Sequence, residues 1–137
     1  RPSDIVNLIS GLGDYSVVVG SRRVARGGSV GWPIYRRFMS CAATSMAKSV
    51  LGVKVRDITS GFAAFRRSAI LPLLPSLNPR GFKILMEIMV KIDPADICEV
   101  PIIFVDRERG QSKFSGYEAI LFVRYCLELA IYRIRRN

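Results

Sequence analysis

The stretch YSVVVG at residues 15–20 decides the fold class. Its continuous apolar run predicts a strand that is buried on both faces, as the strands of parallel sheets are. Helices must then cover the sheet, and the neighbouring sequence supplies them. Residues 2–11 are predicted to form a helix capped by Ser3 or Asp4, and residues 33–51 a longer helix that ends at Gly52. The sequence therefore predicts an α/β fold.

The rest of the chain continues this alternation of strands and helices. Short strands are expected at 53–55 and 62–65, a helix that starts at Ser68, a helix at 82–92, and a strand at 96–105 whose Pro101 favours an edge or bulge position. Residues 21–31 are rich in Arg and Gly and are predicted to form a loop. In the helix at 33–51, apolar residues recur at helical spacing and are expected to face inward: Tyr35, Phe38, Met39, Ala42, Met46 and Val50.

Composition limits the function classes. The chain has 137 residues, half of them hydrophobic, which fits one domain at most and excludes a disordered tail. With 21 Lys and Arg against 11 Asp and Glu, the net charge of +10 indicates an anionic partner. There is no His, and the three Cys are widely spaced, which favours reduced thiols. Nucleic acid is disfavoured as the partner, because the arginines lie in loops beside glycines and not along one exposed helix.

Two arginine-rich stretches are candidate phosphate sites. Residues 20–28 follow the carboxyl end of the buried strand, where open α/β sheets bind ligands. Arg36 and Ser40 lie four residues apart on one face of the next helix, close to its amino terminus, where the helix dipole favours anions. A solvated basic loop and an exposed polar helix face explain the same residues without a ligand.

Two later stretches also combine charge with glycine. Asp57 lies in the turn Arg56–Phe62, where it either bonds its own backbone or orients the surrounding arginines or acts as a base. Arg107 and Lys113 flank Gly110 directly after a strand, which fits a phosphate clamp or a flexible surface loop.

The last helix is expected from about Gly116 to Arg135, and from Ala119 to Ile134 nearly every residue is apolar except Arg124, Glu128 and Arg133. It is too interrupted for a transmembrane span, so it either completes the core or lies at a membrane surface with its terminal arginines on anionic headgroups. We therefore separate residues 116–137, as an amphipathic, membrane-interfacial helix, from residues 1–115. The chain opens with Arg1 and not Met, and we expect it to be part of a longer one.

Six motifs in order resemble the dolichol-phosphate (polyprenol-phosphate) mannose synthases of glycosyltransferase family 2. They are VVVGSR at 17–22, GGSVGWPIYRR at 27–37, VRDITSGF at 55–62, GFKILMEI at 81–88, EVPIIFVDR at 99–107 and GQSK at 110–113. Each is weak alone, but their order over most of the chain is specific. The TSGF form resembles mannose synthases more than glucose synthases, although Ala63 stands where many members of the family have Arg.

The resemblance implies the C-terminal portion of a GT-A (nucleotide-diphospho-sugar transferase-like) fold, with residues 1–115 as the C-terminal, acceptor-binding part of the catalytic domain. It implies that Arg22, Arg36, Ser40 and Arg107 hold the acceptor phosphate, that Lys113 lies near the donor phosphates, and that Asp57 acts as a base or an organiser. The nucleotide-binding half and the D-x-D metal ligands of the family lie upstream of the position that matches Arg1. The chain alone is therefore expected to be inactive.

The implied reaction transfers mannose from GDP-mannose to dolichyl or polyprenyl phosphate, with inversion, aided by Mg²⁺ or Mn²⁺ whose ligands lie upstream of residue 1. The implied setting is the cytoplasmic face of a membrane, with a possible membrane-anchoring subunit and no nucleic acid. Two alternatives stay open: a related family 2 transferase that uses UDP-glucose, and a non-catalytic subunit that binds a phosphate or a lipid.

Overall fold

The central sheet is built around the predicted buried strand. The computed structural model of the chain describes residues 2–78, 84–105 and 116–136. Strand β1 (Val17–Ser21) pairs in parallel with β4 (Ile97–Pro101) and antiparallel with β3 (Ala63–Phe65), in the order β3-β1-β4. Every residue of β1 is buried. The predicted α/β class and the strand buried on both faces are therefore confirmed.

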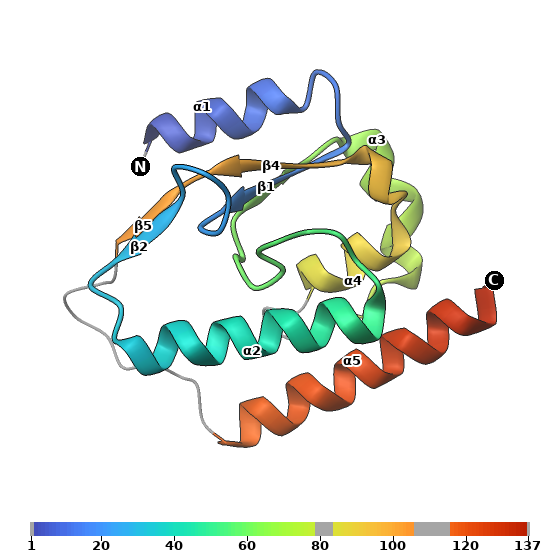
Figure 1. Cartoon of the computed structure of the whole chain (residues 1–137). Coiled ribbons are helices and arrows are strands. Elements are labelled where there is room, and N and C mark those ends of the chain that lie inside the picture. The colour runs from blue at the N-terminus through green and yellow to red at the C-terminus, as the bar shows by residue number, and fades with distance from the viewer. Residues whose placement is uncertain (1, 79–83, 106–115, 137) are drawn as a thin grey trace.

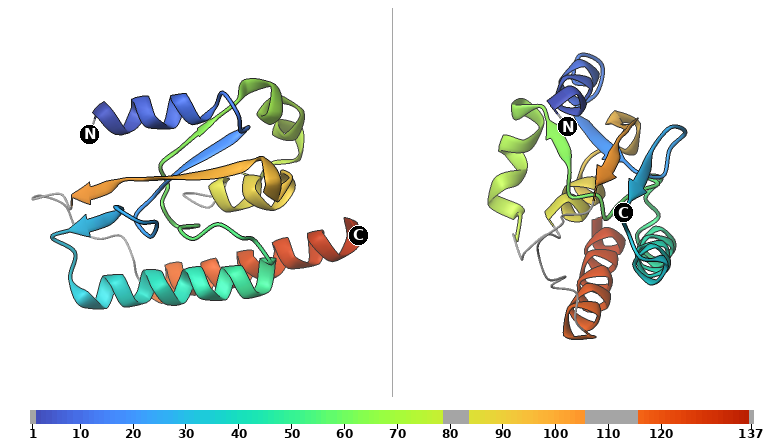
Figure 2. Two further views of the ribbon diagram at one scale, coloured as in Figure 1. Left: turned by 45° about the horizontal axis from the view of Figure 1, so that its top comes forward. Right: turned by 90° about the vertical axis from the view of Figure 1, so that its left-hand side faces the viewer.

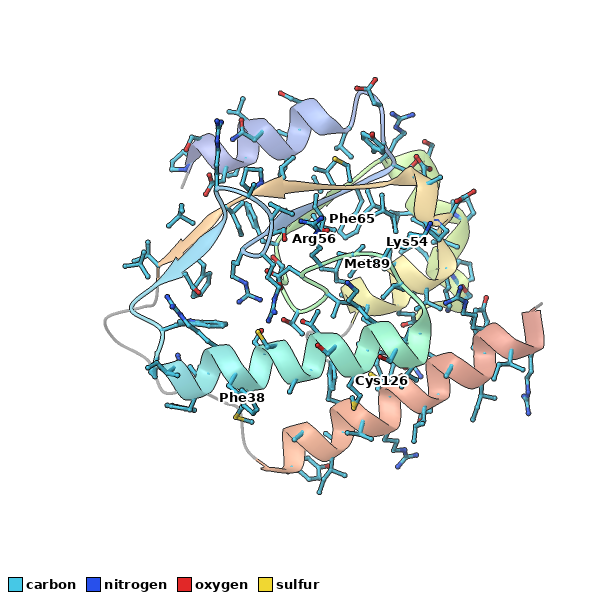
Figure 3. The ribbon with its side chains drawn as sticks, viewed as in Figure 1. Phe38, Lys54, Arg56, Phe65, Met89 and Cys126 are labelled. Atoms are coloured by element: carbon cyan, nitrogen blue, oxygen red, sulfur yellow. The ribbon has the colours of Figure 1, made fainter. Side chains whose placement is uncertain are left out.

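Helices cover both faces of this sheet (Figure 1). Helix α1 (Pro2–Gly11) lies on one face, and α2 (Ile34–Leu51), α4 (Ile84–Lys91) and α5 (Gly116–Arg136) lie on the other, as the two views of Figure 2 also show. The core between the sheet and the second group contains Val17 and Val19 together with Met89 and Cys126, which Figure 3 labels. In the described part of the chain, no helix is long and apolar enough to cross a membrane.

A second small sheet was missed by the sequence prediction. Residues 28–30, predicted as loop, form β2 (Gly28–Val30), which pairs in parallel with β5 (Ile103–Val105). The predicted single strand at 96–105 is wrong, because it is divided at Ile102 between the two sheets. The Ile102 N–H donates to the Ser21 carbonyl, and the Ile102 carbonyl accepts from Gly28 N–H. Pro101, which lacks an N–H, lies just before this division, on a strand at the edge of the described sheet as predicted.

Several predicted boundaries also shift. Helix α1 begins at Pro2, so Ser3 and Asp4 lie inside its first turn and do not cap it; proline is well suited to that first position. Residues 53–55 are not a strand, although Val53 and Val55 are buried. The helix expected from Ser68 is α3 (Arg67–Ile70), which continues into the 3₁₀ helix η1 (Leu71–Ser76). A further 3₁₀ turn, η3 (Pro94–Asp96), precedes β4.

The orientation of α2 is the largest departure from expectation. Its predicted inner face is wrong except for Met46, which packs against the core. Ile34 and Phe38 are 84% and 73% exposed, and Figure 3 shows Phe38 on the side of α2 that faces away from the sheet. The inward stripe runs instead along Arg36, Ser40, Thr44, Ala47 and Leu51. The reason is that Arg22 and Arg23, in the loop that follows β1, lie beneath the first turns of α2, where Arg23 donates to Ser40, so polar side chains face inward there.

Helix α5 is held to α4 by a buried polar cluster. The Glu87 carboxylate accepts hydrogen bonds from Lys91 Nζ and from the Tyr125 hydroxyl, both at 2.7 Å. Burial raises the pKa of Glu87, but the bonds from Lys91 and Tyr125 outweigh that effect and leave the pKa below its usual value. The predicted helix at 116–135 is therefore present and joined to the core, which also includes its Phe122 and Cys126.

Gly20 is required for the close approach of Phe62, which lies directly before β3. A Cβ at Gly20 would lie 2.6 Å from Phe62 Cδ1 and 3.0 Å from Ile102 Cγ2. We expect Gly20→Ala to lower the free energy of unfolding by about 1–3 kcal/mol, because the packed neighbours must move. Chemical denaturation measures this. Gly28→Ala is the matched control, since its Cβ would meet only Ile103 Cδ1, at 3.9 Å; an equal loss in both variants would contradict the argument.

Candidate functional site

The site is centred on a fully buried carboxylate. Asp57 begins a tight turn in which Ser60 N–H donates to the Asp57 carbonyl at 3.2 Å, and its side chain is 0% exposed. Its carboxylate accepts three hydrogen bonds from Arg22: from the backbone N–H at 2.9 Å, and from Nε and Nη2 at 2.7 Å each. The sequence left open whether Asp57 bonds its own backbone, orients the arginines or acts as a base. The geometry supports the second interpretation, because the carboxylate binds and orients Arg22.

Local backbone contacts bring Asp57 to the end of β1. Gly20 N–H donates to the Phe62 carbonyl at 2.8 Å, and the Ser60 hydroxyl donates to the Gly20 carbonyl. From β4, the Glu99 carboxylate accepts from the backbone N–H groups of Arg56 at 2.8 Å and Asp57 at 3.0 Å. The turn is therefore fixed by both neighbouring strands of the sheet.

The charge state of Asp57 follows from these contacts. Burial raises the pKa of this carboxyl, but the hydrogen bonds and the positive charge of Arg22, with a further contribution from Arg23, lower it more. The pKa therefore lies below its usual value, and Asp57 is ionised at neutral pH. An ionised carboxylate with both oxygens bound to a guanidinium is poorly suited to accept a proton.

Helix α2 completes the site from the opposite side. The Ser40 hydroxyl accepts from Arg23 Nη2 at 3.0 Å and lies 3.1 Å from Thr59 Oγ1, which itself accepts from Arg22 Nη2 at 3.2 Å. Arg23 Nε lies 3.8 Å from Asp57 Oδ1. We call these five residues, Arg22, Arg23, Ser40, Asp57 and Thr59, the arginine network.

The loop between β1 and β2 has the shape that the network needs. Gly27 N–H donates to the Val24 carbonyl at 2.9 Å, and a Cβ at Gly27 would lie 2.5 Å from the Ser21 carbonyl oxygen. Arg26 adopts a positive φ of 68° beside it. Only glycine fits a turn this close to the strand end, and the turn brings Arg22 and Arg23 beneath α2.

The structure brings some of the predicted site residues together, and others lie outside the residues that it describes. Arg22, Ser40 and Asp57 are in one network, and Arg36 lies one helix turn before Ser40 on the same inward stripe of α2. Arg107 and Lys113 lie outside the described residues. Sequence analysis included Arg23 in the candidate stretch 20–28 without an individual role for it, and it gave Thr59, a polar neighbour of Asp57, no role.

Trp32 is a further contact that the sequence analysis missed. The Arg22 guanidinium carbon lies 4.7 Å from the centroid of the Trp32 ring and 5.9 Å from that of Phe104. The two rings meet edge to face, with centroids 5.5 Å apart. The sequence signal was the position of Trp32 directly before the helix that carries Arg36 and Ser40.

This arrangement is suited to binding an anion. Guanidinium groups present planar pairs of donors that match phosphate oxygens. The two carboxylates of the site do not fit a metal, because Asp57 is bound by Arg22, and Glu99 by two backbone N–H groups. Within residues 2–78, 84–105 and 116–136, no group of three or more His, Cys, Asp or Glu could hold a metal ion. Fold and site thus define an α/β protein with a buried, arginine-rich polar network at the end of its central strand.

Comparison with known proteins shows which proteins this chain resembles. The chain is 38% identical over 132 residues to the dolichol-phosphate mannosyltransferase of Pyrococcus furiosus, covering 93% of this chain and 37% of that protein. It is 33% identical to the undecaprenyl-phosphate mannosyltransferase of Micrococcus luteus, covering 85% of this chain and 49% of the relative. It is 32% identical to the dolichol-phosphate mannosyltransferase of Saccharomyces cerevisiae, covering 99% and 53%. No family model matches the chain.

The resemblance read from the six motifs is therefore confirmed: over most of its length, this chain is similar to polyprenol-phosphate mannosyltransferases. It spans about half the length of these relatives, or less.

Breaking the central ion pair tests the energetics of the site. We expect Asp57→Asn to lower the free energy of unfolding at neutral pH by about 3–5 kcal/mol, because Arg22 loses its buried counter-charge. The pKa of Asp57 is lowered from 3.8 on folding, so its stabilisation is present above that value and is lost as pH falls from about 4 through the folded pKa. Urea denaturation between pH 2 and 7 should therefore show a shallower acid dependence in the variant.

Exposed Asp14 provides the control, and Asp14→Asn should change stability by less than about 0.5 kcal/mol. An Asp57→Asn variant as stable as wild type at pH 7 would refute a stabilising role for the pair.

Proposed function

We propose that this chain is the acceptor-binding part of a mannosyltransferase that makes polyprenyl-phosphate mannose, with a GT-A fold. The donor in this proposal is GDP-mannose, the acceptor is dolichyl or polyprenyl phosphate, and the anomeric carbon is inverted. The single observation that carries the proposal is the arginine network, which offers oriented guanidinium donors at the carboxyl end of β1. The names of the three relatives, each a polyprenol-phosphate mannosyltransferase, support it.

The proposed acceptor needs no strong base. A phosphate monoester has a second pKa of about 6, so it is largely dianionic at neutral pH and is already a nucleophile. What it needs is orientation against a second anion, the donor pyrophosphate. In this proposal, Asp57 is an organiser that holds Arg22 and does not take up a proton.

We assign the acceptor phosphate to Arg22, Arg36 and Ser40, with Arg107 added by the resemblance alone. Ser40 and Arg22 meet through Thr59, and Arg36 extends the same stripe toward the start of α2. Lys113 is assigned to the donor phosphates, again by the resemblance. The Mg²⁺ or Mn²⁺ of the proposed reaction would be held by residues upstream of Arg1, as the resemblance implies.

Because the proposed acceptor is a lipid, we place the reaction at a membrane surface, and we take its cytoplasmic face from the resemblance. Two helices support this. The outer side of α2 exposes Ile34, Tyr35 and Phe38, and α5 exposes Ile120 and Ile134. Apolar side chains at this density on neighbouring helices suit the boundary between headgroups and acyl chains. A membrane-anchoring subunit is an additional partner in this proposal.

Substitution of Arg36 tests the assignment of the acceptor site. In the full natural protein, Arg36→Ala is expected to raise the acceptor KM or lower kcat/KM for the acceptor about 10- to 150-fold, because a charge-assisted contact is worth about 1.5–3 kcal/mol. The KM for GDP-mannose should change little. Transfer of radiolabelled mannose measures both values, and Arg107→Ala should behave in the same way.

The adjacent Arg37 supplies a matched control. Arg37 is exposed and its Nη2 donates to the Ser29 carbonyl. Arg37→Ala therefore removes the same charge as Arg36→Ala, but from a residue that does not lie on the inward stripe of α2. Equal losses from both substitutions would contradict a specific phosphate contact at Arg36. Transfer from UDP-glucose with no transfer from GDP-mannose would overturn the proposed donor.

Vesicle binding tests the proposed membrane surface. We expect the double variant Ile34→Ser, Phe38→Ser to bind anionic vesicles at least about tenfold more weakly, because burying each apolar side chain contributes about 1.5–3 kcal/mol. Binding should also weaken as salt is raised, since the headgroups attract the basic chain through screened charges. Co-sedimentation with vesicles measures both effects.

Point variants are preferable to removing α5, because its Phe122 and Cys126 belong to the core. The matched control is Leu71→Ser, Leu74→Ser, which removes two similarly apolar, exposed side chains from η1. Loss of binding in the control alone would place the membrane surface elsewhere.

A further inference from the structure

The Arg22 side chain is constrained along one edge by hydrogen bonds. Nε and Nη2 bind the Asp57 carboxylate, and Nη2 also donates to Thr59. Among the described residues, Nη1 of Arg22 has no hydrogen-bond partner. The side chain is only 8% exposed, so it is fixed within the protein. A bidentate edge of this kind fixes the position of the guanidinium but leaves it able to tilt about that edge.

Two aromatic rings constrain the remaining motion. The Arg22 guanidinium lies over the Trp32 ring, with 4.7 Å from Cζ to the ring centroid, and Phe104 meets Trp32 edge to face. A cation over an indole ring is attracted to the ring face, most strongly where water is excluded. Asp57 therefore fixes the edge of Arg22, and Trp32 fixes its plane.

The second sheet is what places Trp32 there. In the β2–β5 pairing, Ser29 lies opposite Phe104 and Val30 opposite Val105, and Trp32 follows two residues later. Pro33 and α2 come next, so the sheet that positions the ring also positions the start of the helix that carries Arg36 and Ser40. Trp32 is thus the contact that links the orientation of Arg22 to the orientation of α2.

We propose that Trp32 is a positioning residue for the acceptor phosphate: it holds the plane of Arg22 so that Nη1 is directed toward the phosphate bound beside α2. The inference rests on the proposed function and adds a residue to that site. Trp32 itself donates nothing to the phosphate in this proposal, and it acts through Arg22. Its removal should therefore weaken acceptor binding without removing a charge.

Kinetics on the full natural protein provide the first test. Trp32→Leu is expected to raise the acceptor KM roughly 3- to 30-fold, the range that a cation–π contact supports, with a smaller change in kcat. Trp32→Tyr, which keeps a ring face, should recover most of the loss. Tyr15→Leu, an aromatic removed at the far end of β1, is the matched control and should leave the acceptor KM unchanged.

A double-mutant cycle separates positioning from general stability. Lysine keeps the charge of Arg22 but has no planar face, so Trp32→Leu should add little further loss in an Arg22→Lys background. Fully additive losses, or an acceptor KM that Trp32→Leu leaves unchanged, would overturn the proposal.

A binding measurement keeps this inference independent of the transfer reaction. Tryptophan is replaced with 5-fluorotryptophan, and the ¹⁹F signal of Trp32 is assigned by its absence in Trp32→Tyr. A water-soluble, short-chain isoprenyl monophosphate should shift that signal, and the corresponding alcohol should not. Wild-type protein that shows this response without transferring mannose would contradict the proposed function alone. A Trp32 signal unmoved by the phosphate in an enzyme that uses it as acceptor would contradict the present inference alone.

Discussion

The buried ion pair between Arg22 and Asp57 is the interaction on which the rest of the site depends. Removing both charges from water is costly, and the attraction between them offsets that cost only when the geometry is good. Here the carboxylate accepts three hydrogen bonds from one arginine. Such a fit tolerates little movement, so the strand end and the turn must be held rigidly. Gly20 and Glu99 supply that rigidity through backbone contacts on either side.

The buried ion pair also explains why α2 turns polar residues toward the sheet and apolar residues away from it. Because the end of β1 presents guanidinium groups, the first turns of α2 must offer polar atoms to them, and Ser40 does so. Farther along, the stripe becomes apolar at Ala47 and Leu51, where it meets the hydrophobic core. The larger apolar residues of the helix are then left on its outer side. One helix thus combines a polar inner site with an apolar outer surface.

The sequence predicted the elements better than their orientation. The apolar run at 17–19 and the glycine at 52 identified β1 and the end of α2, because burial and a left-handed residue leave local signals. Periodicity failed for the inner face of α2, since it assumes that apolar residues point to the core. The β2–β5 pairing was missed because strands this short are defined by a distant partner and not by their own residues.

The site divides in a similar way. The arginines and Asp57 could be named as candidates from residue type and neighbouring glycines, but their pairing could not, because 35 residues separate Arg22 from Asp57 in the chain. Trp32 gave no signal that connected it to Arg22, since the contact depends on the second sheet. Contacts made across the fold are the part of a site that a single sequence does not reveal.

Charge balance explains why an arginine site should contain a buried carboxylate at all. The arginine network holds two guanidinium groups and one carboxylate, so it retains one net positive charge. Arg36 on the same stripe adds another. Glu99, bound to the backbone N–H of Asp57, adds one negative charge behind the network. A phosphate monoester carries about −1.5 to −2 charges at neutral pH, so the guanidinium groups of this stripe still attract it. Without Asp57, the same arginines would repel one another when the site is empty and would lack a fixed plane. The Asp57 carboxylate therefore cancels one positive charge and, in return, fixes the orientation of Arg22. In the proposed reaction the acceptor phosphate already carries a negative oxygen, so it needs oriented donors more than it needs a base.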